Sequence, residues 1–305
     1  MQMDELRGAG ASLFSAAVAS EHSYELAEGP LWDEERGRVL WVDINAGHVH
    51  SGSLDGDVIT PSGRLSLNQT VGAVVCSPDG RLLVAGQRDV YRLRGNSRRE
   101  AVASLVPAVK RSRLNDGACD PAGRFLVGSM ALDARERDNC LYQIGADGKV
   151  TIVDHDLTLS NGLAWSPEGT VLYSVDTTPG TIWARPYDAA TGNVGARASV
   201  VCLGDGSPDG LCVDTDGNLW VAIWGAGEVR CYTPGGERLA TVTVPAPHTS
   251  SVAFVGSARD TLLITTARDE LAPEQLAEFP LSGHLFTARP EVAGMPAAPW
   301  AGPPR

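Results

Sequence analysis

The sequence has no long apolar run and little basic charge. No stretch approaches the roughly 18 consecutive apolar residues of a membrane-spanning helix, so no membrane span is expected. Asp4 and Glu5 stand where a secretory signal would be basic, and serines interrupt the apolar stretch 11–19, so no signal peptide is expected. The 37 acidic and 25 basic residues give a net charge of −12, and no basic cluster is longer than 110–113. Nucleic acid and anionic membranes are therefore poor candidate partners.

Several signatures of catalytic or metal-binding sites are also missing. The six cysteines include no Cys-x-x-Cys pair, and Cys76, Cys119 and Cys212 fall in apolar stretches, so we expect free thiols rather than disulfides or a zinc site. No Gly-x-Ser-x-Gly elbow is present, which disfavours a serine hydrolase. The six histidines show no zinc-ligand spacing, and His48 and His50 alternate as on one face of a strand.

What the sequence does contain is a repeat. Six times, at intervals of about 41 to 48 residues, a short apolar strand pattern leads through a tight turn into a second apolar strand. The turns include Pro-Asp-Gly at 78–80, Pro-Ala-Gly at 121–123 and Pro-Glu-Gly at 167–169, in which proline fixes φ early and glycine accepts a positive φ late. Further β-rich runs between these hairpins bring the count to roughly four strands per repeat.

This period predicts an all-β fold, namely a six-bladed β-propeller with four antiparallel strands per blade. A sandwich of two sheets is the alternative, but a sandwich does not need a fixed period. The chain shows no linker at which it would divide. We therefore expect one propeller domain over residues 1–305, with a short N-terminal extension of about 1–20.

The residue before the first glycine of each repeat is the best place to look for chemistry. Inner strands of a propeller run along its central channel, so equivalent residues converge on one axis. In the first five repeats these residues are Glu28, Val71, Asp116, Asn161 and Asp209. Carboxylates gathered at the mouth of a channel repel one another unless a cation lies among them.

Glu28, Asn161 and Asp209 therefore form a candidate set of oxygen ligands for one divalent cation at one mouth of the central channel. Two carboxylates and an amide oxygen suit Ca²⁺, Mg²⁺ or Mn²⁺, and Zn²⁺ also accepts such ligands. The alternative is that each is an ordinary loop or turn residue, because Asn-Gly and Asp-Gly are common turn pairs.

Four motifs occur in order and in phase with the repeat: Glu-Gly-Pro-Leu-Trp at 28–32, Arg-Leu-Asn-Asp-Gly at 113–117, Ser-Asn-Gly-Leu-Ala-Trp-Ser at 160–166 and Pro-Asp-Gly-Leu-Cys-Val-Asp at 208–214. These motifs resemble the senescence marker protein/gluconolactonase/luciferin-regenerating-enzyme-like family. The resemblance runs from about residue 24 to the tail around Pro299. It implies a six-bladed propeller that binds one divalent cation and hydrolyses sugar lactones.

The resemblance also implies roles for individual residues. The family's metal ligands carry over onto Glu28, Asn161 and Asp209, and its substrate-binding Arg and Asn carry over onto Arg113 and Asn115. The acidic residue that the family places after a Gly-Thr-Met-like segment has no equivalent at the same spacing. Asp133 is the nearest candidate for substrate binding. The polar loop 131–139 is either a lid over the channel mouth or a solvated surface loop.

The predicted reaction is hydrolysis of a sugar lactone of the gluconolactone type to the sugar acid. A divalent cation would act as a Lewis acid on the lactone carbonyl and activate water, with Asp209 as the catalytic carboxylate. Two alternatives remain: an esterase or phosphotriesterase with the same metal site, and a propeller that holds calcium or binds a partner without catalysis. The resemblance favours a cytoplasmic enzyme, as a monomer or small homo-oligomer.

Overall fold

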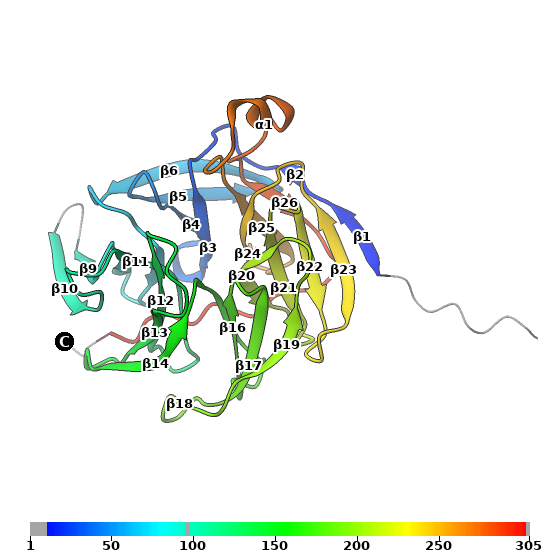
Figure 1. The fold of residues 1–305 in the computed structure, drawn as a ribbon. Helices are drawn as coiled ribbons and strands as arrows, with labels where there is room; N and C mark the ends of the chain where they lie inside the picture. The colour runs from blue at the N-terminus through cyan, green and yellow to red at the C-terminus, as the bar shows by residue number, and fades with distance from the viewer. Residues whose placement is uncertain (1–10, 95–97, 303–305) are drawn as a thin grey trace, which may run out of the picture.

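The computed structural model describes residues 11–94 and 98–302. Its strands form six sheets arranged as blades around a central axis, which confirms the predicted six-bladed propeller with antiparallel blades (Figure 1). Each blade begins with an inner strand and continues outward strand by strand. A sandwich of two sheets is therefore wrong for this chain.

The first three blades follow the chain without interruption. Blade 1 consists of β3 (Ala27–Asp33), β4 (Arg38–Asp43), β5 (His48–Asp55) and β6 (Val58–Ser66). Blade 2 consists of β7 (Ala73–Cys76), β8 (Leu82–Ala85), β9 (Asp89–Arg94) and β10 (Arg98–Ser104). Blade 3 consists of β11 (Ser112–Cys119), β12 (Phe125–Ala131), β13 (Asn139–Ile144) and β14 (Val150–Leu157).

The remaining blades depart from the simple pattern. Blade 4 consists of β15 (Ser160–Trp165), β16 (Val171–Asp176), β17 (Thr181–Asp188) and β19 (Ala198–Cys202), with the short β18 (Asn193–Val194) also paired to β17. Blade 5 contains β20 (Ser207–Val213), β21 (Leu219–Trp224), β22 (Glu228–Tyr232) and β23 (Arg238–Thr243). Blade 6 contains β24 (Thr249–Val255), β25 (Thr261–Thr266) and β26 (Phe286–Ala288).

The N-terminal segment completes the last two blades. Strand β2 (Ala17–Val18) pairs antiparallel with β26 and supplies the fourth strand of blade 6. Strand β1 (Ser12–Ser15) pairs parallel with β23 as a fifth strand of blade 5. The described part of the expected N-terminal extension is thus built into the ring. Its backbone groups cover two outer edges that would otherwise be unpaired. Residues 1–10 lie outside the described residues.

Two short helical segments join strands, although the sequence pattern predicted none. The helix α1 (Pro273–Glu278) lies in the connection between β25 and β26 (Figure 1). A single 3₁₀ turn, η1 (Glu34–Arg36), joins β3 to β4. Neither buries a side chain, so neither carries the apolar period that would reveal it in the sequence. No helix in the described ranges is long and apolar enough to cross a membrane.

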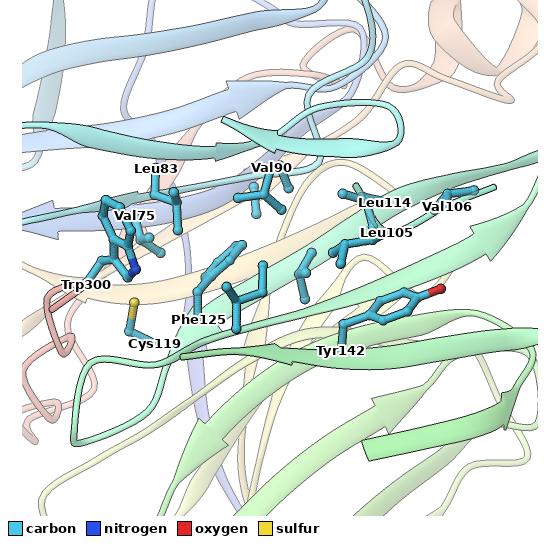
Figure 2. Close-up of a cluster of buried hydrophobic side chains, with 14 residues drawn as sticks. Val75, Leu83, Val90, Leu105, Val106, Leu114, Cys119, Phe125, Tyr142 and Trp300 are labelled. Carbon is cyan, nitrogen blue, oxygen red and sulfur yellow. The ribbon is translucent and has the colours of Figure 1, made fainter. Parts of the chain in front are cut away.

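Apolar side chains fill the spaces between neighbouring blades. Figure 2 shows one such cluster, in which Val75 and Leu83 of blade 2 meet Leu114 and Phe125 of blade 3. Trp300, close to the C-terminus, inserts into the same cluster and is fully buried. The apolar strand residues of the repeat therefore pack neighbouring blades against each other. The residues at the starts of the inner strands are not needed for this packing and can be polar.

The C-terminal segment crosses one end of the ring (Figure 1). Gly294 N donates to Arg259 O at 2.8 Å and Met295 N donates to Val213 O at 3.1 Å, which attaches the segment to blades 6 and 5. Trp300 N then donates to Cys76 O at 2.8 Å, which attaches it to blade 2 on the other side. This end holds the turns that follow the inner strands, so the starts of the inner strands lie at the opposite end.

Candidate active site

The candidate residues lie where the inner strands begin, and each lies at a local irregularity. The pairing register shifts between Glu28 and Leu31 in β3, between Asn161 and Leu163 in β15, and between Pro208 and Leu211 in β20. Strand β11 has the same shift just after Leu114. Such bulges release backbone from the ladder and redirect side chains. Strand β7 pairs with β8 in a regular register, and its blade carries the apolar Val71 at this phase.

Blades 3 and 4 are connected by a chain of polar side chains at this end of the channel. Arg113 Nη1 donates to Asn115 Oδ1 at 2.5 Å and to Leu114 O at 3.0 Å. Asn115 Nδ2 donates in turn to Asn161 Oδ1 and to Ser160 O, both at 3.0 Å. All of these hydrogen bonds are buried. The predicted substrate residue Asn115 therefore contacts both Arg113 and the predicted metal ligand Asn161.

Glu28 and Asp209 come together from blades 1 and 5. Both side chains are buried, with 4% and 5% of the residue exposed, and they lie close enough for the charge of Asp209 to act on Glu28. Burial raises the pKa of Glu28 well above its usual range, and the charges of Asp209 and Asp116 raise it further. Burial likewise raises the pKa of Asp209, and Asp116 adds to the effect. Without a compensating positive charge, these carboxylates resist ionising together.

Asp116 is a further acidic group at this site that the predicted ligand set left out. It is half-buried at the same repeat phase, and its Oδ1 accepts a 2.8 Å hydrogen bond from Gly117 N. Burial raises the pKa of Asp116 to about 6. Its position in the repeat pointed to Asp116, but the metal ligands that the family resemblance implied do not include it.

Arg113 is the cation that faces this acidic group. Burial lowers the pKa of Arg113 to about 10, while the charges of Glu28, Asp269 and Asp209 act in the opposite direction. Asp269 follows β25 and was not predicted as a site residue. It lies outside the hairpin motif, so its position in the repeat gave no signal. A buried guanidinium among carboxylates is held in one orientation and presents fixed donors to a ligand.

Asp133 does not join the buried group. It lies in the loop after β12, next to the channel end where β11 begins, but it is exposed and its Oδ1 accepts a 2.7 Å hydrogen bond from Arg135 Nε. Arg135 also pairs with Asp138, and Lys110 Nζ lies 2.7 Å from Asp138 Oδ1. The loop 131–139 is thus tied to the start of β11 by charged side chains.

An apolar cavity, which we call the apolar chamber, lies farther along the inner strands than the polar group. This cavity of about 510 Å³ is lined by residues of all six inner strands, from Asp116 at the polar end to side chains such as Leu211 and Phe254. Residues 295–299 of the C-terminal segment line its far end.

The polar group contains carboxyl and amide oxygens, which are the ligands of hard cations. Within the described ranges, no three His, Cys, Asp or Glu side chains are grouped so as to hold a metal ion. The predicted set contains only two carboxylates, and its third member is an amide. Asp209 Oδ1 is buried without a hydrogen-bond partner, which leaves a carboxyl oxygen available beside Glu28 and Asn161. An oxygen-seeking cation fits this arrangement.

The chain is thus a six-bladed propeller with buried carboxyl, amide and guanidinium groups gathered at one end of its channel. Residues 26–268 match the model of the SMP-30/gluconolactonase/LRE-like region. The chain therefore belongs to this family, as its motifs predicted.

Individual relatives agree with this assignment along almost the whole chain. The chain is 32% identical over 282 residues to 6-deoxy-6-sulfogluconolactonase from Pseudomonas putida, covering 91% of this chain and 95% of that protein. It is 32% identical over 293 residues to regucalcin from Gallus gallus, covering 92% and 96%. A solved structure of regucalcin from Agrobacterium tumefaciens, described as a calcium-binding protein, has a TM-score of 0.89 at 28% identity and covers 95% of this chain and 99% of that one.

Proposed function

We propose that this protein hydrolyses a sugar lactone and uses one divalent cation held by Glu28, Asn161 and Asp209. The observation that carries the proposal is the buried, unpartnered Asp209 Oδ1 beside Glu28 and Asn161. Membership of a family with a gluconolactonase among its relatives supports a lactone as the substrate. The calcium-binding description of the solved regucalcin favours Ca²⁺ among the divalent cations.

Each side chain at the mouth of the channel has its own role in catalysis. A bound divalent cation would supply Lewis-acid stabilisation at the carbonyl oxygen and lower the pKa of water. Asp209 accepts the proton of the attacking water as general base. Arg113 donates to the ring oxygen or hydroxyl groups of the lactone, and Asn115 holds Arg113 and Asn161 in place. Asp133 contacts substrate hydroxyls from the rim once its ion pair with Arg135 opens.

A proton-release assay tests this function. Chelated protein is assayed on gluconolactone with and without added Ca²⁺, Mg²⁺, Mn²⁺ or Zn²⁺, in the wild type and in Asp209→Asn. Asp216→Asn is the matched control, because Asp216 is an exposed aspartate in the same blade. We expect hydrolysis to return with metal in the wild type and in the control, and to be lost in Asp209→Asn.

Several results would overturn the proposal. Wild-type hydrolysis no faster than the spontaneous reaction with every cation would exclude lactonase activity on this lactone, and further sugar lactones would be tried in the same assay. Activity on simple esters or phosphotriesters alone would assign the site to that chemistry instead. Calcium binding without any hydrolysis would indicate a propeller that holds calcium.

A further inference from the structure

Two aromatic rings border the mouth of the channel on the side of blades 5 and 6. Trp224 and His248 stack with ring centroids 4.1 Å apart and ring planes 16° from parallel. The two residues also form an isolated antiparallel bridge, which joins the end of β21 to the residue just before β24. Both are partly exposed. The backbone bridge and the ring stack together fix this pair as one rigid unit.

The strand register places the pair at the same end of the channel as the candidate active site. Trp224 pairs with Ser207, two residues before Asp209 on the inner strand of blade 5. His248 Nδ1 lies 2.9 Å from Asp269 O, so the imidazole is tied to the residue whose charge acts on Arg113. The rings therefore lie between the blade that carries Asp209 and the segment that carries Asp269.

The other tryptophans are used elsewhere, and all seven lie in the described residues. Trp32 and Trp165 line the apolar chamber near the far end of the inner strands, and Trp300 is buried between blades 2 and 3. The remaining three pack against neighbours in the blades: Trp41 against His50, Trp183 under Arg197 and Trp220 against Phe254. Trp224 is thus the tryptophan at the polar end of the channel.

The mouth therefore has two unlike sides. Arg113, Asn115 and Asn161 supply donors and acceptors from blades 3 and 4. On the side of blades 5 and 6 lies the partly exposed Trp224–His248 stack, in which Trp224 also packs against the buried apolar cluster that contains Ala267. A sugar ring has the matching asymmetry, since its hydroxyl groups point outward along the edge while C–H groups cover its faces.

We propose that the Trp224–His248 pair is a specificity wall, against which the C–H face of a ring-closed sugar lactone packs while its hydroxyl edge meets Arg113 and Asn115. This inference rests on the proposed lactonase function. It favours cyclic, polyhydroxylated substrates over the open-chain acids formed from them, because an open chain presents no flat face. Trp224 is a specificity-determining residue in this account, and it takes no part in proton transfer.

Gluconolactone and its open-chain product gluconate distinguish a contact with the sugar face from a purely structural role of Trp224. In Trp224→Leu, KM for gluconolactone is expected to rise about 3- to 10-fold, as for the loss of an aromatic contact, while kcat changes less than 2-fold. The inhibition constant of open-chain gluconate should change less than about 2-fold. Trp224→Phe keeps an aromatic face and should keep KM near the wild-type value.

The outcomes are distinguishable. An equal rise in KM and in the gluconate inhibition constant would show general disturbance of the mouth and would overturn the wall. Unchanged KM in a Trp224→Leu protein with normal thermal unfolding would also overturn it. If the wild type hydrolyses no lactone, the proposed function fails, and calorimetric binding of methyl glucopyranoside then tests the wall. Binding that weakens in Trp224→Leu but not in Trp224→Phe supports it, and any other binding result rejects it.

Discussion

Asn115 and Asn161 are joined by a 3.0 Å hydrogen bond from Nδ2 to Oδ1, although they lie 46 positions apart and belong to neighbouring blades. The same Asn115 accepts from Arg113, so one amide connects a predicted substrate residue to a predicted metal ligand. Both residues are buried, and each of these bonds is therefore costly to leave unmade.

Replacing Asn115 by alanine should impair the site without unfolding the protein. Asn115→Ala leaves Arg113 Nη1 without its side-chain acceptor and removes the donor to Asn161 Oδ1. We expect kcat/KM for gluconolactone to fall by about 10- to 100-fold, as for the loss of buried, charge-assisted hydrogen bonds. Asn193→Ala, on the exposed strand β18, is the control and should retain full activity. Equal activity of both variants would remove Asn115 from the site.

A second buried network should affect stability alone. Asp120 is fully buried and accepts hydrogen bonds from Tyr187 and Arg124 as well as from two backbone amides. Tyr187→Phe removes one donor and should lower the free energy of unfolding by about 1–2 kcal/mol. Denaturant unfolding measures this loss. Tyr173→Phe, at a buried tyrosine of the adjacent strand β16, is the control, and an equal loss there would rule out a special contribution from Asp120.

His50 should make the protein less stable as the pH falls below neutrality. It is buried against Trp41, its Nε2 has no hydrogen-bond partner, and burial lowers its pKa from 6.5 to about 4. Between pH 6.5 and 4 the unfolded chain therefore binds a proton that the folded chain excludes. Stability is full above this window and falls through it, by about 3 kcal/mol in total.

Denaturant unfolding across this pH range checks the effect of His50. In His50→Phe the loss of stability between pH 6.5 and 4 should be smaller than in the wild type. His22→Gln, at an exposed histidine, is the control and should lose stability in parallel with the wild type. If His50→Phe and the wild type lose stability in parallel, His50 does not stay neutral in the folded protein.

The C-terminal segment should stabilise the ring without setting substrate affinity. Trp300 is fully buried between blades 2 and 3, at the end of the channel opposite Asp209. Trp300→Ala should lower the free energy of unfolding by about 3–5 kcal/mol, as other large buried truncations do. Trp300→Phe should cost less. KM for gluconolactone measured well below the lowered Tm should stay unchanged, and a large change would mean that the tail communicates with the polar end.

The features that could be predicted from the sequence are those that recur in every repeat. Each blade's first two strands carry the apolar runs and the tight turn, so the six blades and the positions of Glu28, Asn161 and Asp209 followed from their phase. The outer strands β1 and β2 could not be predicted in the same way, because they pair with strands more than 200 residues away. Trp224 and His248 come from two different repeats and occupy different positions within them, so the repeat gave no sign of their contact.

The most direct test of this account is to titrate Ca²⁺ into chelated protein while gluconolactone hydrolysis is followed in the same sample. If Glu28, Asn161 and Asp209 hold one catalytic cation, activity should rise with added metal and level off at one equivalent, and Asp209→Asn should neither bind that equivalent nor gain activity. Full hydrolysis by the chelated wild type, or metal-dependent hydrolysis that survives Asp209→Asn, would contradict it.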